Sequence, residues 1–123
     1  RGRIVVLDFW ATWCGPCLKG LPHLQALRRE YGDDVVIVGV TRESLATVGD
    51  FLADRPSNYP ILLDPEGKAG DAFRVSSLPA LYLLDGGGVV REHFVGMQPI
   101  ETIRDALARM AVAPVPSEPD SLN

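Results

Sequence analysis

The sequence contains few cysteines, and this scarcity excludes two classes of small protein. Only Cys14 and Cys17 occur among 123 residues, both within one Trp-Cys-Gly-Pro-Cys run. A disulfide-held scaffold needs several cysteine pairs that close long loops, and a four-cysteine zinc site needs two further cysteines. A mixed zinc site would have to recruit His23 and His93, which lack the usual spacing of zinc ligands. Leu18, and not a histidine, follows the pair, so the motif for c-type haem attachment is absent.

The sequence also lacks a long apolar run and an excess of positive charge. No stretch of about 18 apolar residues occurs, so we expect no segment of this sequence to span a bilayer. Lys and Arg number 12 against 16 Asp and Glu, for a formal net charge of −4. Because nucleic-acid-binding domains usually carry a clustered basic face, we expect no nucleic-acid partner. Hydrophobic residues make up 46% of the chain, which is enough for a substantial core.

The two ends of the sequence differ from its middle. The chain opens on Arg1-Gly2-Arg3 and enters an apolar strand almost at once, with no visible signal peptide. We therefore expect a fragment from which an N-terminal signal, a membrane anchor or extra strands have been removed. Three prolines and no apolar periodicity mark the C-terminal end. We assign residues 1–111 to a single domain and residues 112–123 to a disordered tail.

Apolar periodicity predicts strands that alternate with helices. The predicted strands cover residues 4–7 with a continuation to 10, then 35–40, 61–63, 80–84 and 89–95. The predicted helices run from 14 to about 31, from 44 to just before 56, over 69–73, and from 99 to 110. Alternation implies parallel strands with right-handed crossovers, and the Asp85-Gly86-Gly87-Gly88 turn predicts a terminal antiparallel hairpin. The expected fold class is α/β, a mixed central sheet covered by helices on both faces.

The cysteine pair lies at the predicted junction of a strand and a helix. Residues three apart share one face of a helix, close enough for a disulfide. Amides at the helix N-terminus stabilise a thiolate at Cys14, and a thiolate is the species that attacks disulfides. We therefore expect Cys14 to be the nucleophile and Cys17 to resolve the mixed disulfide. Gly15 allows a tight approach and Pro16 fixes the first helical turn. The cysteine pair itself carries two electrons, so we expect no metal, flavin or nucleotide cofactor.

The segment from Leu7 to Cys17, Leu-Asp-Phe-Trp-Ala-Thr-Trp-Cys-Gly-Pro-Cys, resembles the active-site signature of the thioredoxin superfamily. Pro22 matches the kinking proline of that family's active-site helix. Leu78-Pro79 matches its cis-proline, and Gly96 matches the glycine that follows the hairpin. The likeness covers about residues 4–111. It implies a thioredoxin-like fold and thiol-disulfide exchange.

Two further segments, Gly39–Ser44 and Tyr59–Asp64, resemble the central insertion of the TlpA/ResA-like subgroup. That resemblance implies an extracytoplasmic thiol-disulfide oxidoreductase, commonly tethered to a membrane, and several members of the subgroup serve cytochrome c maturation. It also implies a protein disulfide as substrate and an upstream dithiol as electron donor. The Gly15-Pro16 pair resembles reducing thioredoxins, which favours a reductase, and we expect a monomer. A cytoplasmic location is the alternative, because thioredoxins with two cysteines also work there.

Two carboxylates are candidate site residues through the same resemblance. Asp8 stands where thioredoxin places a buried carboxylate behind the second cysteine, although many TlpA-like proteins carry asparagine there. Burial raises the pKa of such a group and lets it accept a proton from Cys17. The alternative for Asp8 is a strand-end side chain that reaches water. Glu43 matches a ResA-like glutamate that affects cysteine ionisation, and its alternative is a solvated carboxylate in a first helical turn.

The expected substrate surface surrounds the cysteine pair. By resemblance, a cis bond at Pro79 lets Leu78 present its backbone to an incoming peptide, and the alternative is an ordinary turn. Trp13 is expected to form an exposed apolar platform beside Cys14. Gly15 completes the surface together with its neighbour Pro16. The residues assigned to packing or surface roles, without catalysis, are Trp10, His23 and His93.

Three other functions stay open. A disulfide oxidase or isomerase would use the same residues as a reductase and would differ from it in the direction of electron flow. A peroxidase of the peroxiredoxin type is disfavoured, because its reactive cysteine does not normally sit in a WCxxC arrangement. A non-enzymatic module would use the surface between Trp13 and Pro79 only to bind peptides.

Overall fold

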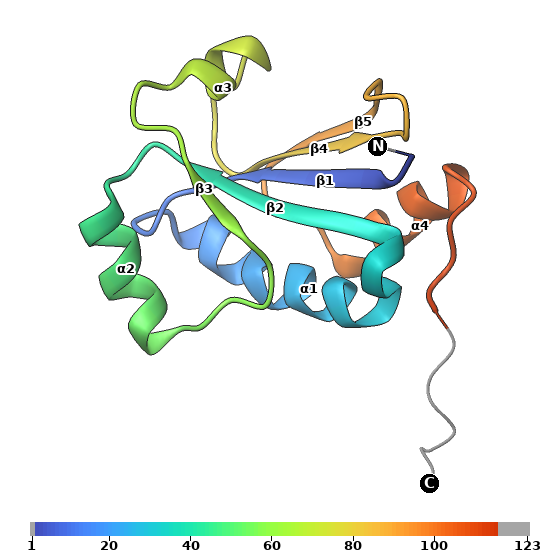
Figure 1. Cartoon of the computed structure of the whole chain (residues 1–123), viewed down its shortest axis with the longest axis horizontal. Coiled ribbons are helices and arrows are strands. Elements are labelled where there is room, and N and C mark those ends of the chain that lie inside the picture. The colour runs from blue at the N-terminus through green and yellow to red at the C-terminus, as the bar shows by residue number, and fades with distance from the viewer. Residues whose placement is uncertain (1, 116–123) are drawn as a thin grey trace, which may run out of the picture.

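In the computed structural model, which describes residues 2–115, five strands and four α-helices alternate along the chain (Figure 1). The strands are β1 Ile4–Phe9, β2 Val35–Thr41, β3 Ile61–Leu63, β4 Ala80–Leu84 and β5 Val90–Val95. The helices are α1 Gly15–Tyr31, α2 Leu45–Asp54, α3 Lys68–Ala72 and α4 Ile100–Arg109, and a 3-10 turn, Gly32–Asp34, follows α1. Each predicted strand and helix is present, with ends that differ by a few residues.

The strands form one mixed sheet in the order β3-β2-β1-β4-β5. β1 runs parallel to β2, β2 runs parallel to β3, and β4 is antiparallel to both β1 and β5. The predicted hairpin is confirmed. Its turn is held by Asp85, whose Oδ1 accepts hydrogen bonds from the amides of Gly87 and Val89. In the central strand, Asp8 pairs with Gly39 on one side and Leu81 on the other, so Asp8 lies in the middle of the sheet.

Helix α1 carries the cysteine pair at its first turn and covers the sheet with its buried face. Its buried residues recur at helical spacing, and they are Cys17, Leu24, Leu27 and Tyr31. Pro22 lies inside the helix without ending it. The helix ends at Gly32, whose φ of 56° is a left-handed value that glycine adopts without a steric penalty.

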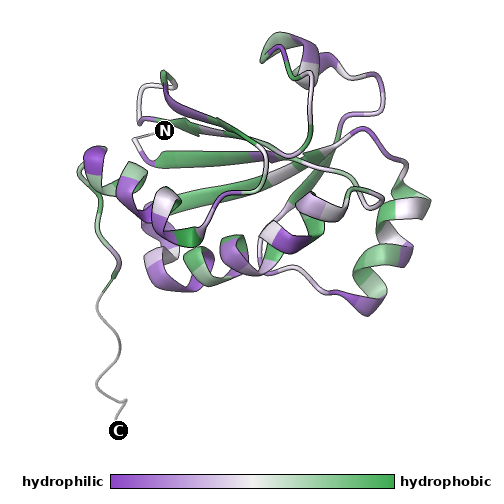
Figure 2. Cartoon of the chain, turned by 180° about the vertical axis from the view of Figure 1, so that it is seen from behind, coloured by the Kyte–Doolittle hydropathy of each residue, from purple (hydrophilic) through white to green (hydrophobic). Residues whose placement is uncertain are grey.

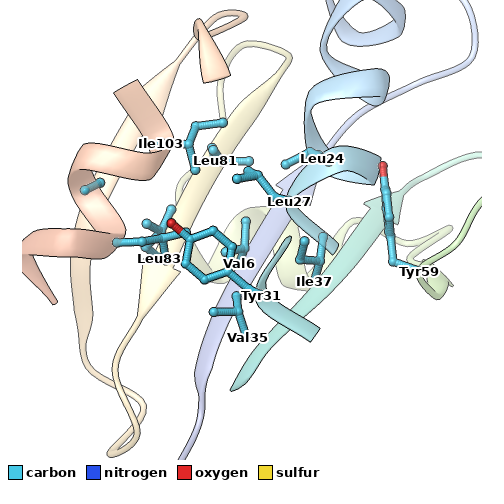
Figure 3. Packing of buried hydrophobic residues seen from close by; sticks show 12 residues of the cluster. Val6, Leu24, Leu27, Tyr31, Val35, Ile37, Tyr59, Leu81, Leu83 and Ile103 are labelled. Atoms are coloured by element: carbon cyan, nitrogen blue, oxygen red, sulfur yellow. The ribbon is translucent and has the colours of Figure 1, made fainter. Parts of the chain in front are cut away.

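Helices lie on both faces of the sheet, as predicted, with α1 and α4 on one face and the short α3 on the other (Figure 1). On one face α1 and α4 enclose the larger core, and Figure 3 shows its side chains between these helices and the strands. On the other face, near α3, Phe9, Phe73 and Tyr82 form an aromatic cluster with ring centroids 5.0–5.7 Å apart. The central strands are hydrophobic along most of their length, whereas the helices mix both kinds of residue (Figure 2). This contrast is typical of strands buried on both faces and helices buried on one.

The segment that follows α4 packs back onto the domain. Val112 contacts the main core, and the amide of Val115 donates a hydrogen bond to the carbonyl of Glu30 in α1 (2.8 Å). Val112 and Val115, in the first part of the predicted tail, thus contact the domain. The rest of it, residues 116–123, lies outside the described residues. Among residues 2–115, no helix has the length and apolar character needed to cross a membrane.

Candidate active site

The cysteine pair forms a disulfide at the N-terminus of α1. The Cα atoms of Cys14 and Cys17 are 5.2 Å apart, as the spacing of three residues predicts. Cys14 is the N-cap residue of the helix, and its Sγ accepts a hydrogen bond from the amide of Cys17 (3.2 Å). The Sγ of Cys14 therefore lies at the positive end of the helix dipole, where a negative charge on sulfur is stabilised.

The surroundings of the disulfide combine buried and exposed side chains. Cys14 and Cys17 are 5% and 2% exposed, whereas Trp13 is 74% exposed and its neighbours Gly15 and Pro16 are exposed too. The expected platform at Trp13 is thus an open apolar surface directly beside Cys14. The other tryptophan, Trp10, is buried, in agreement with its predicted packing role.

Two loops from the far half of the sequence complete the site. The Leu78-Pro79 peptide bond is cis, as the resemblance implied. Leu78 packs against the cluster that contains both cysteines. The amide of Gly96, whose φ is 91°, donates a hydrogen bond to the carbonyl of Pro79 (2.8 Å). The end of β5 therefore supports the proline loop beside the cysteine pair.

Asp8 lies behind the second cysteine and out of contact with bulk water. Its side chain is buried, and this burial raises the pKa of the carboxyl group to about 7. Asp8, Cys17 and Pro79 line one small cavity of about 20 Å³, which is room for about one water molecule. The alternative of a strand-end aspartate open to water is wrong. Asp8 is instead a buried carboxyl group that lines the same cavity as Cys17.

His23 lines the same cavity, although the sequence analysis assigned it only a packing or surface role. Its Nδ1 lies 3.0 Å from the backbone carbonyl of Gln98, in the loop after β5. A weak signal for this position exists in the sequence. Cys17, Gly20 and His23 recur every three residues on α1, and all three line the cavity.

Tyr59 is a second residue near Asp8 that the sequence analysis did not single out. It precedes β3 in the segment that resembles the subgroup's insertion, and its side chain is buried at one end of the core beside Leu24 (Figure 3). Burial, with the negative charge of Asp8 as a smaller cause, raises the pKa of the Tyr59 phenol. The phenol therefore stays protonated when Asp8 is ionised.

Glu43 binds the loop that leads into the cysteine pair. Its carboxylate accepts hydrogen bonds from the amide of Thr12 (2.8 Å), the hydroxyl of Thr12 (2.7 Å) and the hydroxyl of Thr41 (3.1 Å). The alternative of a solvated first-turn carboxylate is wrong, because Glu43 precedes α2 and is half-buried. An influence of Glu43 on the cysteines thus passes through Thr12, two residues before Cys14.

The second histidine lies apart from these groups. His93 is exposed on β5, and its ring stacks on Tyr82 with centroids 4.2 Å apart. Its predicted packing or surface role is confirmed. Within the part of the chain that the structure describes, no group of three or more His, Cys, Asp or Glu side chains could hold a metal ion.

Comparisons with known proteins agree with this geometry. The model of the AhpC/TSA family matches residues 1–93. The chain belongs to the AhpC/TSA family. Its mixed sheet is thioredoxin-like, and it resembles the crystal structure of a putative thiol:disulfide interchange protein DsbE from Chlorobium tepidum. That match has a TM-score of 0.78 and 30% identity, and it covers 88% of this chain and 79% of the other.

Curated relatives of this AhpC/TSA-family chain include two proteins of Bacillus subtilis strain 168. The thioredoxin-like protein YneN is 37% identical over 100 residues, which cover 78% of this chain and 58% of YneN. The thiol-disulfide oxidoreductase ResA is 32% identical over 108 residues, which cover 85% of this chain and 60% of ResA. The chain thus spans about three-fifths of the length of each relative.

We expect Glu43 to act in this AhpC/TSA-family domain by holding the active-site loop. Glu43→Ala leaves the amide and hydroxyl of Thr12 without their acceptor, which costs about 1–3 kcal/mol of stability. It should also slow disulfide exchange several-fold. Glu43→Gln keeps one oxygen acceptor and one polar partner for Thr12, so it should retain most of the stability and the rate. Urea unfolding and exchange kinetics at pH 7 check both variants. Equal losses in the two variants would show that the charge of Glu43, and not the tie to Thr12, matters.

Proposed function

We propose that this domain is a thiol-disulfide oxidoreductase that reduces disulfide bonds in other proteins. The observation that carries the proposal is the Sγ of Cys14 at the N-cap of α1, with Cys17 bonded to it. An exposed platform at Trp13 and a cis-proline loop at Pro79 flank the pair. Transfer of electrons to a protein disulfide requires a reactive sulfur, a partner sulfur and an open apolar surface where the substrate can bind.

The first step is attack by the Cys14 thiolate on a disulfide of the substrate. A bond forms between Cys14 and one substrate sulfur, and the second substrate sulfur leaves as a thiolate that takes a proton from solvent. The α1 N-terminus supports this step, because its amides stabilise the negative charge on Cys14 before the attack. The product is a mixed disulfide between the domain and its substrate.

The second step releases the reduced substrate. Cys17 gives its proton to Asp8, and the Cys17 thiolate attacks the sulfur of Cys14, so the mixed disulfide breaks and the substrate leaves as a thiolate that is then protonated. Two electrons have passed to the substrate, and the domain holds its disulfide again. The shared cavity and the raised pKa of Asp8 support this role, because a carboxylate with a pKa near 7 accepts a proton efficiently at neutral pH.

The substrate is proposed to bind as an extended peptide across the surface around the disulfide. Trp13 offers an apolar face, and Gly15 and Pro16 leave the approach to Cys14 open. Leu78 and Pro79 lie on the opposite side of the pair, where the backbone of Leu78 is the proposed partner for the peptide backbone.

The biological setting is proposed from the relatives. ResA is named a thiol-disulfide oxidoreductase, and the DsbE neighbour is named a thiol:disulfide interchange protein. We propose an extracytoplasmic, monomeric domain with a membrane tether outside this sequence and a part in cytochrome c maturation. An upstream dithiol protein regenerates the reduced cysteine pair. The pair itself carries the electrons, so we propose no further cofactor for the domain.

Equilibration of the domain with dithiothreitol or glutathione buffers tests the direction of electron flow. We expect a reduction potential closer to that of thioredoxin, about −270 mV, than to that of DsbA, about −120 mV. The oxidised and reduced fractions are counted by thiol labelling and mass spectrometry, and turnover is followed on a disulfide-bonded test protein such as insulin. A potential near the DsbA value would make the domain an oxidase. Rapid consumption of hydrogen peroxide without a disulfide substrate would favour a peroxidase instead.

A further inference from the structure

The cavity behind the disulfide connects three groups that can carry a proton. It lies between α1, β1, β4, the loop after β5 and α4, and its titratable lining residues are Asp8, Cys17 and His23. Tyr59 does not line this cavity, although the charge of Asp8 contributes to the raised pKa of its phenol. The remaining lining residues carry no titratable side chain, and they are Gly20, Leu24, Pro79, Leu81, Gly96, Met97, Gln98 and Ile103.

His23 differs from the other two groups in that it borders both the cavity and the solvent. Asp8 and Cys17 are 4% and 2% exposed, whereas His23 is half-buried on α1. A proton that reaches Asp8 from Cys17 therefore has no direct contact with bulk water at that carboxyl group. Among the titratable residues that line the cavity, His23 is therefore the one whose side chain is partly open to solvent.

The hydrogen bond of His23 determines which of its nitrogens can take up a proton. The backbone carbonyl of Gln98 only accepts hydrogen bonds, so the Nδ1 atom 3.0 Å away must carry the hydrogen. In the neutral ring this leaves the lone pair on Nε2. A ring nitrogen with a free lone pair can accept a proton and later release it, as a group that carries protons in turn requires.

We propose that His23 carries protons between the buried carboxyl group of Asp8 and solvent during thiol-disulfide exchange. This inference rests on the proposed function, because it concerns the second step of that reaction. Cys17 transfers its proton to the Asp8 carboxylate, and Cys17 then attacks Cys14 and displaces the substrate thiolate. Asp8 passes the proton to Nε2 of His23, His23 releases it to water, and the departing thiolate takes up one proton from water. When an upstream dithiol reduces the domain, the same protons move inward.

The substitution His23→Asn separates proton transfer from structure. The side-chain amide nitrogen of asparagine can occupy the place of Nδ1 and donate to the carbonyl of Gln98, but the asparagine side chain cannot take up a proton at neutral pH. His93→Asn is the matched control, because it makes the same change at an exposed histidine that does not line the cavity.

Stopped-flow oxidation of the reduced domain by the aromatic disulfide DTNB reports both steps, since each displaces one coloured thiolate. We expect His23→Asn to leave the first release unchanged and to slow the second release roughly 10-fold at pH 6, where Asp8 must first lose a proton. The loss should shrink as the pH rises above 7. Added imidazole, at constant ionic strength, should restore the second release, because a small base in solution replaces the missing ring.

A double variant completes the test. His23→Asn should add no further loss in the Asp8→Asn background, since no proton then resides at position 8. Additive losses, equal slowing of both releases, a pH-independent loss, or no effect of imidazole would overturn the role of His23. If the unmodified domain shows no faster first release than its Cys14→Ser variant, the proposed function itself fails, and the role of His23 falls with it.

Discussion

The Cys17→Ser variant should accumulate a covalent adduct with a disulfide-containing protein. Attack by Cys14 proceeds as in the unmodified domain, because the N-cap position of its sulfur on α1 does not depend on the second sulfur. Resolution then stops, since serine cannot displace the substrate from the mixed disulfide. Non-reducing electrophoresis and intact-mass measurement should find the adduct at Cys14 in most of the protein. Dithiothreitol should release it.

The Cys14→Ser variant is the matched control for that trap. It should form no adduct, and its rate of disulfide reduction should fall more than about 1,000-fold, as expected for removal of a nucleophile. The remaining sulfur, Cys17, is 2% exposed and faces the cavity with Asp8. An adduct at Cys17 in this variant, or none at Cys14 in the Cys17→Ser variant, would reverse the assigned roles.

Asp8→Asn should stabilise the oxidised domain at neutral and alkaline pH. The folded chain raises the pKa of Asp8 from an ordinary 3.8 to about 7, so the folded state binds this proton more tightly than the unfolded state does. Stability is therefore lost as the pH rises from about 4 to 7, and above this range the buried charge costs about 4 kcal/mol. Asparagine carries no charge and avoids that cost. The gain should be largest at pH 8 and should vanish near pH 4.

Urea unfolding of the oxidised domain between pH 4 and pH 9, followed by circular dichroism, measures this gain. Asp50→Asn is a suitable control, because it makes the same exchange at an exposed aspartate on α2. A difference between Asp8→Asn and the unmodified domain that is the same at every pH would show that burial does not shift the pKa of Asp8. The result would then also remove the support for Asp8 as the proton acceptor of Cys17.

Local patterns were sufficient to predict the elements of the fold and the position of the cysteine pair at the start of a helix. The spacing of apolar residues determines which face of a helix or strand is buried. Asp85 forms the hairpin turn where expected, and Ser44 caps α2 at the residue where the helix was predicted to begin. The position of Cys14 at the N-terminus of α1 follows from the same local reasoning. The burial of Asp8 also agrees with the prediction, because Asp8 lies within the contiguous segment that resembles the thioredoxin signature.

Contacts between distant segments could not be predicted in this way. Glu43 reaches Thr12 across 31 residues, and this pairing depends on how the end of β2 lies beside the loop after β1. The position of His23 in the cavity depends on its contact with the loop after β5. His23 in α1 and its partner Gln98 in that loop are 75 residues apart in the sequence. Val115 docks on α1 through a backbone hydrogen bond to Glu30, and a backbone contact of this kind has no signature in the sequence.

Limited alkylation of the reduced domain by iodoacetamide, with mass mapping of the labelled cysteine at a series of pH values, tests most directly whether a helix N-terminus activates one sulfur. Our account predicts that Cys14 is labelled well before Cys17. It also predicts that labelling of Cys14 reaches half its maximal rate at a lower pH in the folded domain than in the same chain unfolded in urea. Equal labelling of both cysteines, or the same pH dependence in the folded and unfolded chains, would contradict it.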